Sequence, residues 1–329
     1  MDDEKIYQKK KNNLRNSFLL VILSLFLYAI LWGVFFQSTL DIVDANNRSE
    51  SIVIVGNVPP NVTSVIIENG DASIYLIAGG NKSIQCNATI VDWNGDTSVS
   101  NATSIFWHSG GTTLKTASDD NNNHYSNTNC TLDYSYGDTY TLTALCQFNV
   151  TYYANNGTWT CSVNATDNTS LSSEGYDNIS VEALLAVNIP NTIHYGTVNA
   201  LAVSNENITN VTNWGNVDID LNVEGYGWVD GDGLAMRCTL GNIANISLHY
   251  EKYNLSASTL GALNFSQFNS TYIELTDTAV LNPFNLNQRQ DDNNIDNATK
   301  QTYWRVYVPL GVAGTCNGTV LMGAVYSNS

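Results

Sequence analysis

The longest apolar stretch of the chain runs from Phe18 to Phe36 and contains no charged residue. As a helix, these nineteen residues would extend about 28 Å, close to the roughly 30 Å hydrocarbon core of a bilayer. The pattern therefore predicts one transmembrane helix over residues 17–36. A cleaved signal peptide is the alternative, but signal h-regions run about 7–15 residues and end in small residues. A pilin-type leader fits less well, because Asn16-Ser17 stands where Gly or Ala would precede the cut.

The flanking charges predict the orientation of this helix. Residues 1–16 hold five cations and three anions, a net charge of +2, and basic flanks stay in the cytoplasm. We therefore expect a cytoplasmic basic tail (1–16), a signal-anchor helix that crosses the cell membrane once, a stalk (37–56) and an extracellular remainder.

After the stalk, short β-branched and aromatic runs alternate with turns rich in Gly, Asn and Asp, such as Asn69-Gly-Asp71. Short strands at this spacing are typical of β-sandwiches. The predicted fold class is all-β, with two tandem antiparallel sandwiches over residues 57–183 and 184–329. The sequence shows no flexible linker between them, which favours a fixed angle between the two.

In the second predicted domain, three runs are expected to form strands: Ile193–Val198, Val217–Val223 and Thr302–Val308. The middle run alternates apolar residues with Asp218, Asp220 and Asn222, which predicts a strand with one face in water.

Charge and composition exclude some function classes. The formal net charge is −17, so residues 17–329 carry −17 − 2 = −19. A surface of this sign repels nucleic acid and anionic lipid. We therefore expect no nucleic-acid partner. The expected partners are the membrane, a surface protein or glycan, and other copies of the chain.

Asparagine is frequent and is placed in glycosylation sequons. From Gln37 onward there are 42 Asn, 26 Ser and 31 Thr in 293 positions, and chance would give about eight Asn-x-Ser/Thr sites. The sequence has 19, an excess that predicts a glycosylated surface. The acceptors would be Asn47, Asn61, Asn81, Asn87, Asn101, Asn129, Asn149, Asn156, Asn164, Asn168, Asn178, Asn207, Asn210, Asn245, Asn254, Asn264, Asn269, Asn297 and Asn317.

Six cysteines without a C-x-x-C pair favour three extracellular disulfides over a metal cluster. Cys86, Trp107 and Cys161 follow the order found in immunoglobulin sandwiches, and Gly157-x-Trp159-x-Cys161 is similar to that family's Gly-x-Tyr-x-Cys corner. This resemblance implies a Cys86–Cys161 bridge between facing sheets, with Trp107 packed against it. Division into domains then leaves Cys130 with Cys146 and Cys238 with Cys316. The replacement of Tyr by Trp159 puts the corner hydrogen bond in question.

Residues 57–329 resemble archaeal-type cell-surface proteins with tandem immunoglobulin-like domains behind a membrane anchor. The segments that carry this resemblance are Asp119–Cys130, Gly157–Cys161, Asn213–Asp220 and Tyr303–Gly311. The resemblance implies a role at the surface or in the envelope rather than a chemical reaction.

No catalytic motif accompanies the four histidines. His124 and His194 are expected to be solvated or at a strand edge, and no catalytic or cofactor-binding residue is predicted. Clustered oxygen ligands make Asp119, Asp120, Asp230 and Asp232 candidates for structural Ca²⁺, although ordinary Asn/Asp turns explain the same clusters.

These features together predict a non-enzymatic glycoprotein that acts in adhesion or envelope structure. Two alternatives stay open. One is a subunit of a pilus-like filament or surface lattice, built by helix packing or by strands exchanged between copies. The other, less favoured, is a membrane-anchored hydrolase.

Overall fold

The computed structural model describes residues 3–40, 50–242, 245–291 and 296–327. It separates into two compact units, Met1–Val55 and Gly56–Ser329. The helices are α1 (Asp3–Leu40) and α2 (Phe265–Thr271). The strands are β1 (Asn61–Ile67), β2 (Ser73–Ile74), β3 (Asn81–Val91), β4 (Val99–Trp107), β5 (His124–Asn127), β6 (Thr131–Asp133), β7 (Thr141–Thr151), β8 (Gly157–Asp167), β9 (Ser172–Val181), β10 (Val187–Asn188), β11 (Asn207–Asn213), β12 (Ile219–Tyr226), β13 (Leu234–Gly241), β14 (Asn245–Ser247), β15 (Glu251–Asn254), β16 (Ile273–Glu274), β17 (Val280–Leu286), β18 (Thr299–Val306), β19 (Val312–Asn317) and β20 (Thr319–Tyr326).

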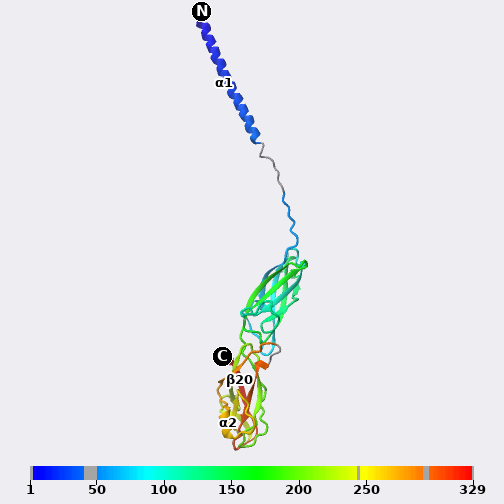
Figure 1. Cartoon of the computed structure of the whole chain (residues 1–329), viewed down its shortest axis with the longest axis vertical. Coiled ribbons are helices and arrows are strands. Elements are labelled where there is room, and N and C mark those ends of the chain that lie inside the picture. The colour runs from blue at the N-terminus through cyan, green and yellow to red at the C-terminus, as the bar shows by residue number, and fades with distance from the viewer. Residues whose placement is uncertain (1–2, 41–49, 243–244, 292–295, 328–329) are drawn as a thin grey trace. The chain divides into compact units, whose positions relative to one another are not determined.

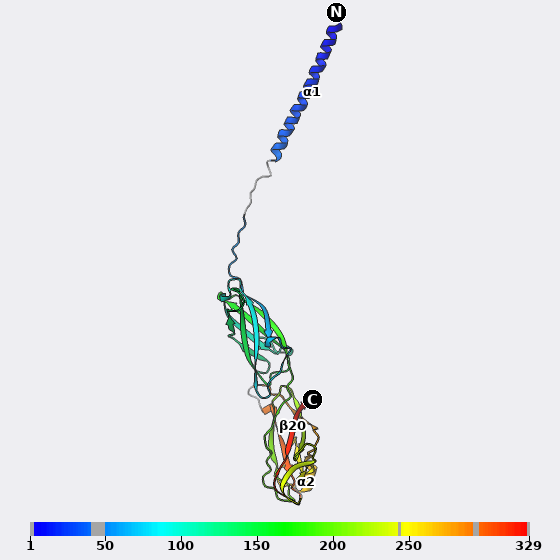
Figure 2. The same ribbon diagram turned by 180° about the vertical axis from the view of Figure 1, so that it is seen from behind.

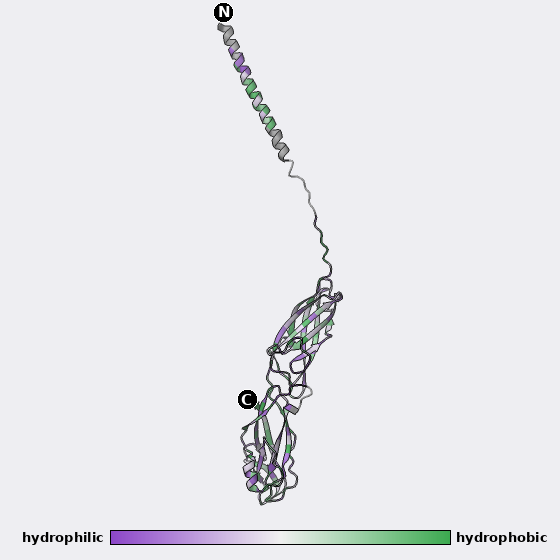
Figure 3. Cartoon of the chain, viewed as in Figure 1, coloured by the Kyte–Doolittle hydropathy of each residue, from purple (hydrophilic) through white to green (hydrophobic). Residues whose placement is uncertain are grey.

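The first unit contains α1, which is longer than the predicted membrane span. The helix covers Asp3–Leu40, so the basic tail continues it without a break. The segment long and apolar enough to cross a membrane is Asn12–Leu31, and none of its described side chains is buried within the protein. Figure 3 shows the hydrophilic turns first and the hydrophobic span after them.

The second unit is all-β, as predicted. It contains two hydrophobic cores, each enclosed by its own sheets (Figures 1 and 2). In sandwich 1 (residues 61–181), a sheet ordered β1-β3-β7-β6 faces one ordered β2-β9-β8-β4-β5. All pairings in these two sheets are antiparallel except β2 with β9. Along β3 and β7, core-facing residues alternate with more exposed ones, which is the expected pattern for strands that form one wall of a sandwich.

Sandwich 2 (residues 187–326) has a five-stranded sheet ordered β10-β11-β18-β15-β16. Its remaining strands form two three-stranded sheets, β17-β12-β20 and β14-β13-β19. Strands β19 and β20 follow each other directly at Gly318, where an added Cβ would lie 1.7 Å from the carbonyl oxygen of Ala235. Glycine is thus required where this long strand passes from one sheet into the other.

Two predictions about β12 and its surroundings are wrong. Asp220 is buried rather than in water, because its carboxylate accepts the backbone N–H groups of Phe284 and Asn285 at 2.6 and 2.7 Å. The carboxylate thus accepts the two N–H groups at the point where the register between β12 and β17 shifts. The run Ile193–Val198 forms no strand, which is the second wrong prediction. Asp218, in contrast to Asp220, is exposed as expected.

Three disulfides connect Cys86 with Cys161, Cys130 with Cys146, and Cys238 with Cys316, the same pairs that the resemblance and the domain division implied. The first joins β3 to β8 in the facing sheet. Cys86 and Cys146 are direct neighbours across the β3–β7 ladder, so the first two bridges lie side by side. The third joins residues opposite each other on β13 and β19, within one sheet.

The core tryptophan of sandwich 1 is Trp159, not Trp107. Trp107 ends β4 and is half-buried, whereas Trp159 is fully buried and stacks on Phe106 with 4.8 Å between ring centroids. The indole Nε1–H donates a hydrogen bond of 2.7 Å to the carbonyl oxygen of Asn155, four residues upstream. Trp159 therefore provides both the packing of a core tryptophan and the hydrogen bond of a tyrosine corner.

Replacing Trp159 by Phe should lower the free energy of unfolding by roughly 1–3 kcal/mol, because the Asn155 carbonyl loses its partner. Trp159→Ala should cost about 3–5 kcal/mol. Denaturant unfolding of the extracted protein measures both. Trp107→Phe is the matched control and should change stability by less than about 1 kcal/mol; a larger effect at Trp107 than at Trp159 would contradict this assignment.

Polar contacts join the two sandwiches. The side chain of Asn216, fully buried, accepts the N–H of Leu184 at 2.6 Å and donates to the carbonyl oxygens of Ala154 (3.0 Å) and Glu182 (3.1 Å). Gly79 donates its N–H to the carbonyl of Trp214, and an added Cβ at Gly79 would lie 2.4 Å from the indole ring. One amide side chain and one glycine thus hold the connection between the sandwiches.

Gln288 and Arg289 add a second set of contacts between the sandwiches. The Gln288 side chain donates to Asn155 Oδ1, and the guanidinium of Arg289 lies 4.7 Å from the ring centre of Tyr153. The Asn122 side chain donates to the Arg289 carbonyl oxygen at 3.5 Å. Sandwich 2 therefore contacts the same end of sandwich 1 through two separate loops.

Asn216→Ala should leave three backbone groups without their partner and destabilise the connection by roughly 3 kcal/mol or more. Scanning calorimetry of the extracted protein should then show two separate unfolding transitions where the native protein shows coupled ones. Asn199→Ala, at an exposed position, is the control. An unchanged thermogram for Asn216→Ala would mean that the sandwiches unfold independently in the native protein.

Candidate functional site

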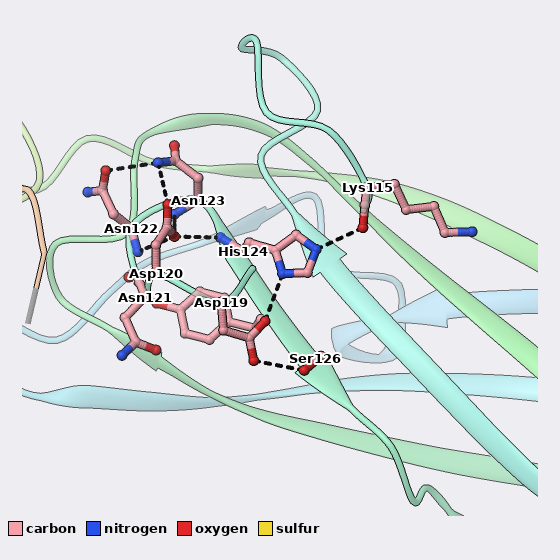
Figure 4. Close-up of polar contacts among 9 residues, drawn as sticks. Lys115, Asp119, Asp120, Asn121, Asn122, Asn123, His124 and Ser126 are labelled. Atoms are coloured by element: carbon pink, nitrogen blue, oxygen red, sulfur yellow. Dashed lines mark hydrogen bonds and ion pairs between the residues drawn. The ribbon is translucent and has the colours of Figure 1, made fainter. Parts of the chain in front are cut away.

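His124 begins the edge strand β5, in agreement with one of the two predicted settings, but it is buried rather than solvated, because residues of the polar loop before β5 contact it (Figure 4). Its Nδ1 lies 2.7 Å from Asp119 Oδ1, and its Nε2 lies 2.9 Å from the carbonyl oxygen of Lys115. The hydroxyl of Ser126 donates to the other Asp119 oxygen at 2.7 Å. Serine and histidine thus both contact the carboxylate and not each other. This arrangement gives the histidine no hydroxyl to activate, so it does not form a nucleophilic triad.

The Asp120 carboxylate organises the same loop. Its Oδ1 accepts the backbone N–H groups of Asn122, Asn123 and His124 at 2.6 to 3.0 Å. Burial raises the pKa of Asp120, but hydrogen bonds from the backbone and side chain of Asn123 outweigh it, and the net pKa is lowered. This carboxylate therefore acts as the acceptor of a turn.

Asp232 plays an equivalent part between β12 and β13. It accepts N–H groups of Gly227, Trp228, Val229 and Leu234. Burial opposes ionisation, but these hydrogen bonds prevail and lower the pKa of Asp232 to about 2. Asp230 in the same loop is exposed.

Within the described residues, no group of three or more His, Cys, Asp or Glu side chains could hold a metal ion. A further run rich in Asp and Asn spans residues 291–296, and its residues 292–295 lie outside the described chain. Calcium binding stays a prediction.

A cavity with a volume of about 690 Å³ lies in sandwich 2. One side consists of residues 189–200, which contain the run that was predicted to be a strand. The other side consists of β19 and the beginning of β20, and β18 contributes Val306. The residues 189–198 are named the edge segment below.

The edge segment alternates like a strand only from Ile193 to Gly196, because the φ of +69° at Gly196 interrupts the extended backbone and Thr197 is exposed as well. Ile193, Tyr195 and Val198 pack against the core, whereas His194 and Gly196 are exposed. Among the described residues, no backbone hydrogen bond joins the edge segment to β20. The sequence pattern predicts the side-chain direction of Ile193 and Tyr195 correctly, but a strand also needs a neighbour at about 4.8 Å, and no described strand pairs with this segment.

A buried carboxyl group lines the cavity. Glu251, 2% exposed at the start of β15, accepts a hydrogen bond of 2.7 Å from the hydroxyl of Tyr195. Burial raises the pKa of Glu251 to about 7, against a smaller opposing effect of the Tyr195 hydrogen bond. No sequence motif marked this residue, because Glu251 and Lys252 stand together between Tyr250 and Tyr253 like an ordinary pair of exposed charges.

Glu251→Gln should remove a pH dependence of stability. The folded pKa of about 7 exceeds the unfolded value, so the native protein is stabilised fully below about pH 4.5 and loses this stability as pH rises through 7. The wild-type protein should therefore be less stable than Glu251→Gln at pH 8, by about 3 kcal/mol, and similar to it at pH 4.

Glu206 supplies the opposite control for this comparison. Burial raises its pKa, but hydrogen bonds from Ser258, Thr259 and Tyr272 prevail, and the net pKa is lowered. Glu206→Gln should therefore lose stability above the unfolded pKa and differ little from wild type at low pH. Thermal unfolding at pH 4, 6 and 8 measures both variants; equal pH profiles for wild type and Glu251→Gln would contradict the assignment.

The predicted glycosylation sites differ from the other asparagines in exposure. Asn47 lies outside the described residues, and each of the remaining 18 sequon asparagines is exposed or half-exposed. The buried asparagines are Asn122, Asn213, Asn216 and Asn282, and none of these four begins a sequon.

No family model and no curated protein matches the chain in sequence. Solved structures resemble it distantly. One is the CsuC–CsuE chaperone–tip adhesion subunit complex of Acinetobacter baumannii Csu pili, with 11% identity, TM-score 0.34, and coverage of 77% of this chain and 97% of that one.

Two further structures are similar at the same low level. A chaperone–tip adhesin complex of CFA/I fimbriae has 8% identity, TM-score 0.27 and 82% coverage of both chains. The C-terminal domain of the Streptococcus agalactiae antigen I/II polypeptide BspA has 12% identity and TM-score 0.22, and the match covers 82% of this chain and all of that domain. At these scores the likeness carries no argument about fold or function.

Proposed function

We propose that this protein is a single-pass, glycosylated cell-surface protein whose two sandwiches act outside the membrane in adhesion or envelope structure, without enzymatic activity. The observation that carries the proposal is the distribution of asparagine over the second unit. Sequon asparagines are accessible at every described position, whereas the buried asparagines are kept out of sequons.

Accessibility is what N-glycosylation requires, because the acceptor must reach the transferase and then project its glycan into water. The half-buried acceptors, such as Asn87 and Asn101, lie on strands next to fully buried residues. Addition of a glycan at these positions keeps the neighbouring core intact. The surface is thus compatible with dense modification of both sandwiches.

Three disulfides support an oxidising compartment for the second unit. The basic residues before the apolar span support a cytoplasmic N-terminus. The same arrangement weighs against the hydrolase alternative, because the polar loop around His124 uses its carboxylates to hold backbone and side-chain hydrogens. What the sandwiches adhere to is a surface protein or a glycan.

Peptide mapping of protein taken from its own membranes tests the proposal. Glycan should be found on accessible sequons such as Asn149 and Asn269, and peptides with Asn122 and Asn213 serve as unmodified controls. A protease added to intact cells should remove the second unit and leave a membrane-bound fragment of α1. Unmodified sequons together with full protease protection would overturn the proposal.

A further inference from the structure

The cavity of sandwich 2 has the properties of a sheet from which one strand is missing. Strand β20 is at the edge of its sheet and has β12 as its strand partner. Its core-facing residues Val320, Met322 and Ala324 pack against the core but stay partly exposed, whereas Leu221 and Val223 on β12 are fully buried. An apolar row that is only partly covered, beside a free backbone edge, can accept a further strand.

The edge segment completes the acceptor from the opposite side. Ile193, Tyr195 and Val198 direct apolar side chains to the core, and among described residues no strand pairs with this backbone. A strand placed between the edge segment and β20 would pair with the free edge of β20 and cover both apolar rows. In the edge segment, the His194 carbonyl and the Gly196 N–H already have side-chain partners, so pairing there would involve the remaining backbone groups. Glu251, the acidic residue among those that line the cavity, is already hydrogen-bonded to Tyr195. The lining combines apolar side chains such as Ile193, Val198 and Met322 with polar side chains and backbone groups.

The chain carries one segment with the matching chemistry. Ile52, Val53, Ile54 and Val55 are 79%, 83%, 91% and 71% exposed, with no strand pairing. Four consecutive β-branched residues favour a strand, and apolar side chains on both faces are typical of one buried on both sides. Exposure of such a run to water is costly, since each residue offers a large apolar surface.

The segment cannot reach the cavity of its own chain. Asn57 is held by hydrogen bonds from its side chain to Asp167 and Thr169, at the last residue of β8. Sandwich 2 contacts sandwich 1 near Asn155, before the first residue of β8. The eleven residues of β8 extend about 33 Å, whereas the residues from Ile52 to Gly56 span about 17 Å at most.

We propose that residues 52–55 of one copy insert as a strand between the edge segment and β20 of a second copy, so that the protein assembles head to tail. This inference rests on the proposed function, since both partners must lie on the same side of the membrane. Main-chain hydrogen bonds would supply affinity and the apolar rows specificity. Such head-to-tail contacts build a linear array when the rotation between copies does not close a ring.

Two single-cysteine variants, co-expressed with different tags, test the contact between copies. Ile54→Cys in one chain and Met322→Cys in the other should give a disulfide-linked heterodimer that reducing agent removes. Val320→Cys replaces Met322→Cys in a second experiment, because the register of an apolar strand is weakly set. Ile54→Cys with Leu240→Cys, exposed on β13 outside the cavity lining, is the matched control and should give no such band. No crosslink to either β20 position, or an equal crosslink to Leu240→Cys, overturns the inference.

A second measurement does not depend on changes in the cavity. Because Ile52–Val55 are exposed, replacing all four by Ser leaves the fold intact, and the gently extracted full chain should change from multimers to monomers in sedimentation. Leu114→Ser with Leu260→Ser, equally exposed apolar positions, should stay multimeric. Monomeric wild-type protein, or an unchanged Ser variant, overturns the inference. Surface labelling with a membrane-impermeant reagent on the same samples tests the proposed location separately. A failure of the extracellular location can therefore be distinguished from a failure of the strand contact between copies.

Discussion

The packing of Trp159 between the two sheets of sandwich 1 is the contact on which that domain depends. Its ring stacks on Phe106 of β4, and two residues later Cys161 links the same strand to β3. The indole N–H also fixes the turn before β8 at Asn155. Asn155 in turn accepts from Gln288 of sandwich 2. Packing, covalent bridging and contact with the next domain thus meet within a few residues of one strand.

Fold class and disulfide pairs could be predicted from the sequence because they depend on local patterns and a few landmarks. Short β-branched runs and turn residues can be recognised in the amino-acid sequence itself. The sequence could not distinguish Trp107 from Trp159 as the core tryptophan, because both stand near a strand end and either indole could face the core. Asp220 shows the same limit: alternation placed it in water, but an irregularity in the neighbouring strand supplied two N–H groups that hold it inside.

The functional regions were only partly accessible to the sequence. Acidic loops were visible, but their oxygens turned out to accept backbone N–H groups, as at Asp120 and Asp232. The cavity was not visible, because it depends on the absence of pairing between β20 and residues far away in the chain. Alternation in Ile193–Val198 and the apolar run Ile52–Val55 were both present in the sequence. Only the structure shows that neither has a neighbouring strand.

The disulfide between Cys86 and Cys161 also has a mechanical consequence. A surface protein tethered at its N-terminus and held at its far end bears tension along its backbone. In sandwich 1 that tension would pass through the bridge, since its two cysteines are 75 positions apart in the chain, and the intervening residues would carry no load. Cys238 and Cys316, 78 positions apart, shorten the extensible length of sandwich 2 in the same way. Under pulling force the second unit would therefore lengthen far less than its contour length allows.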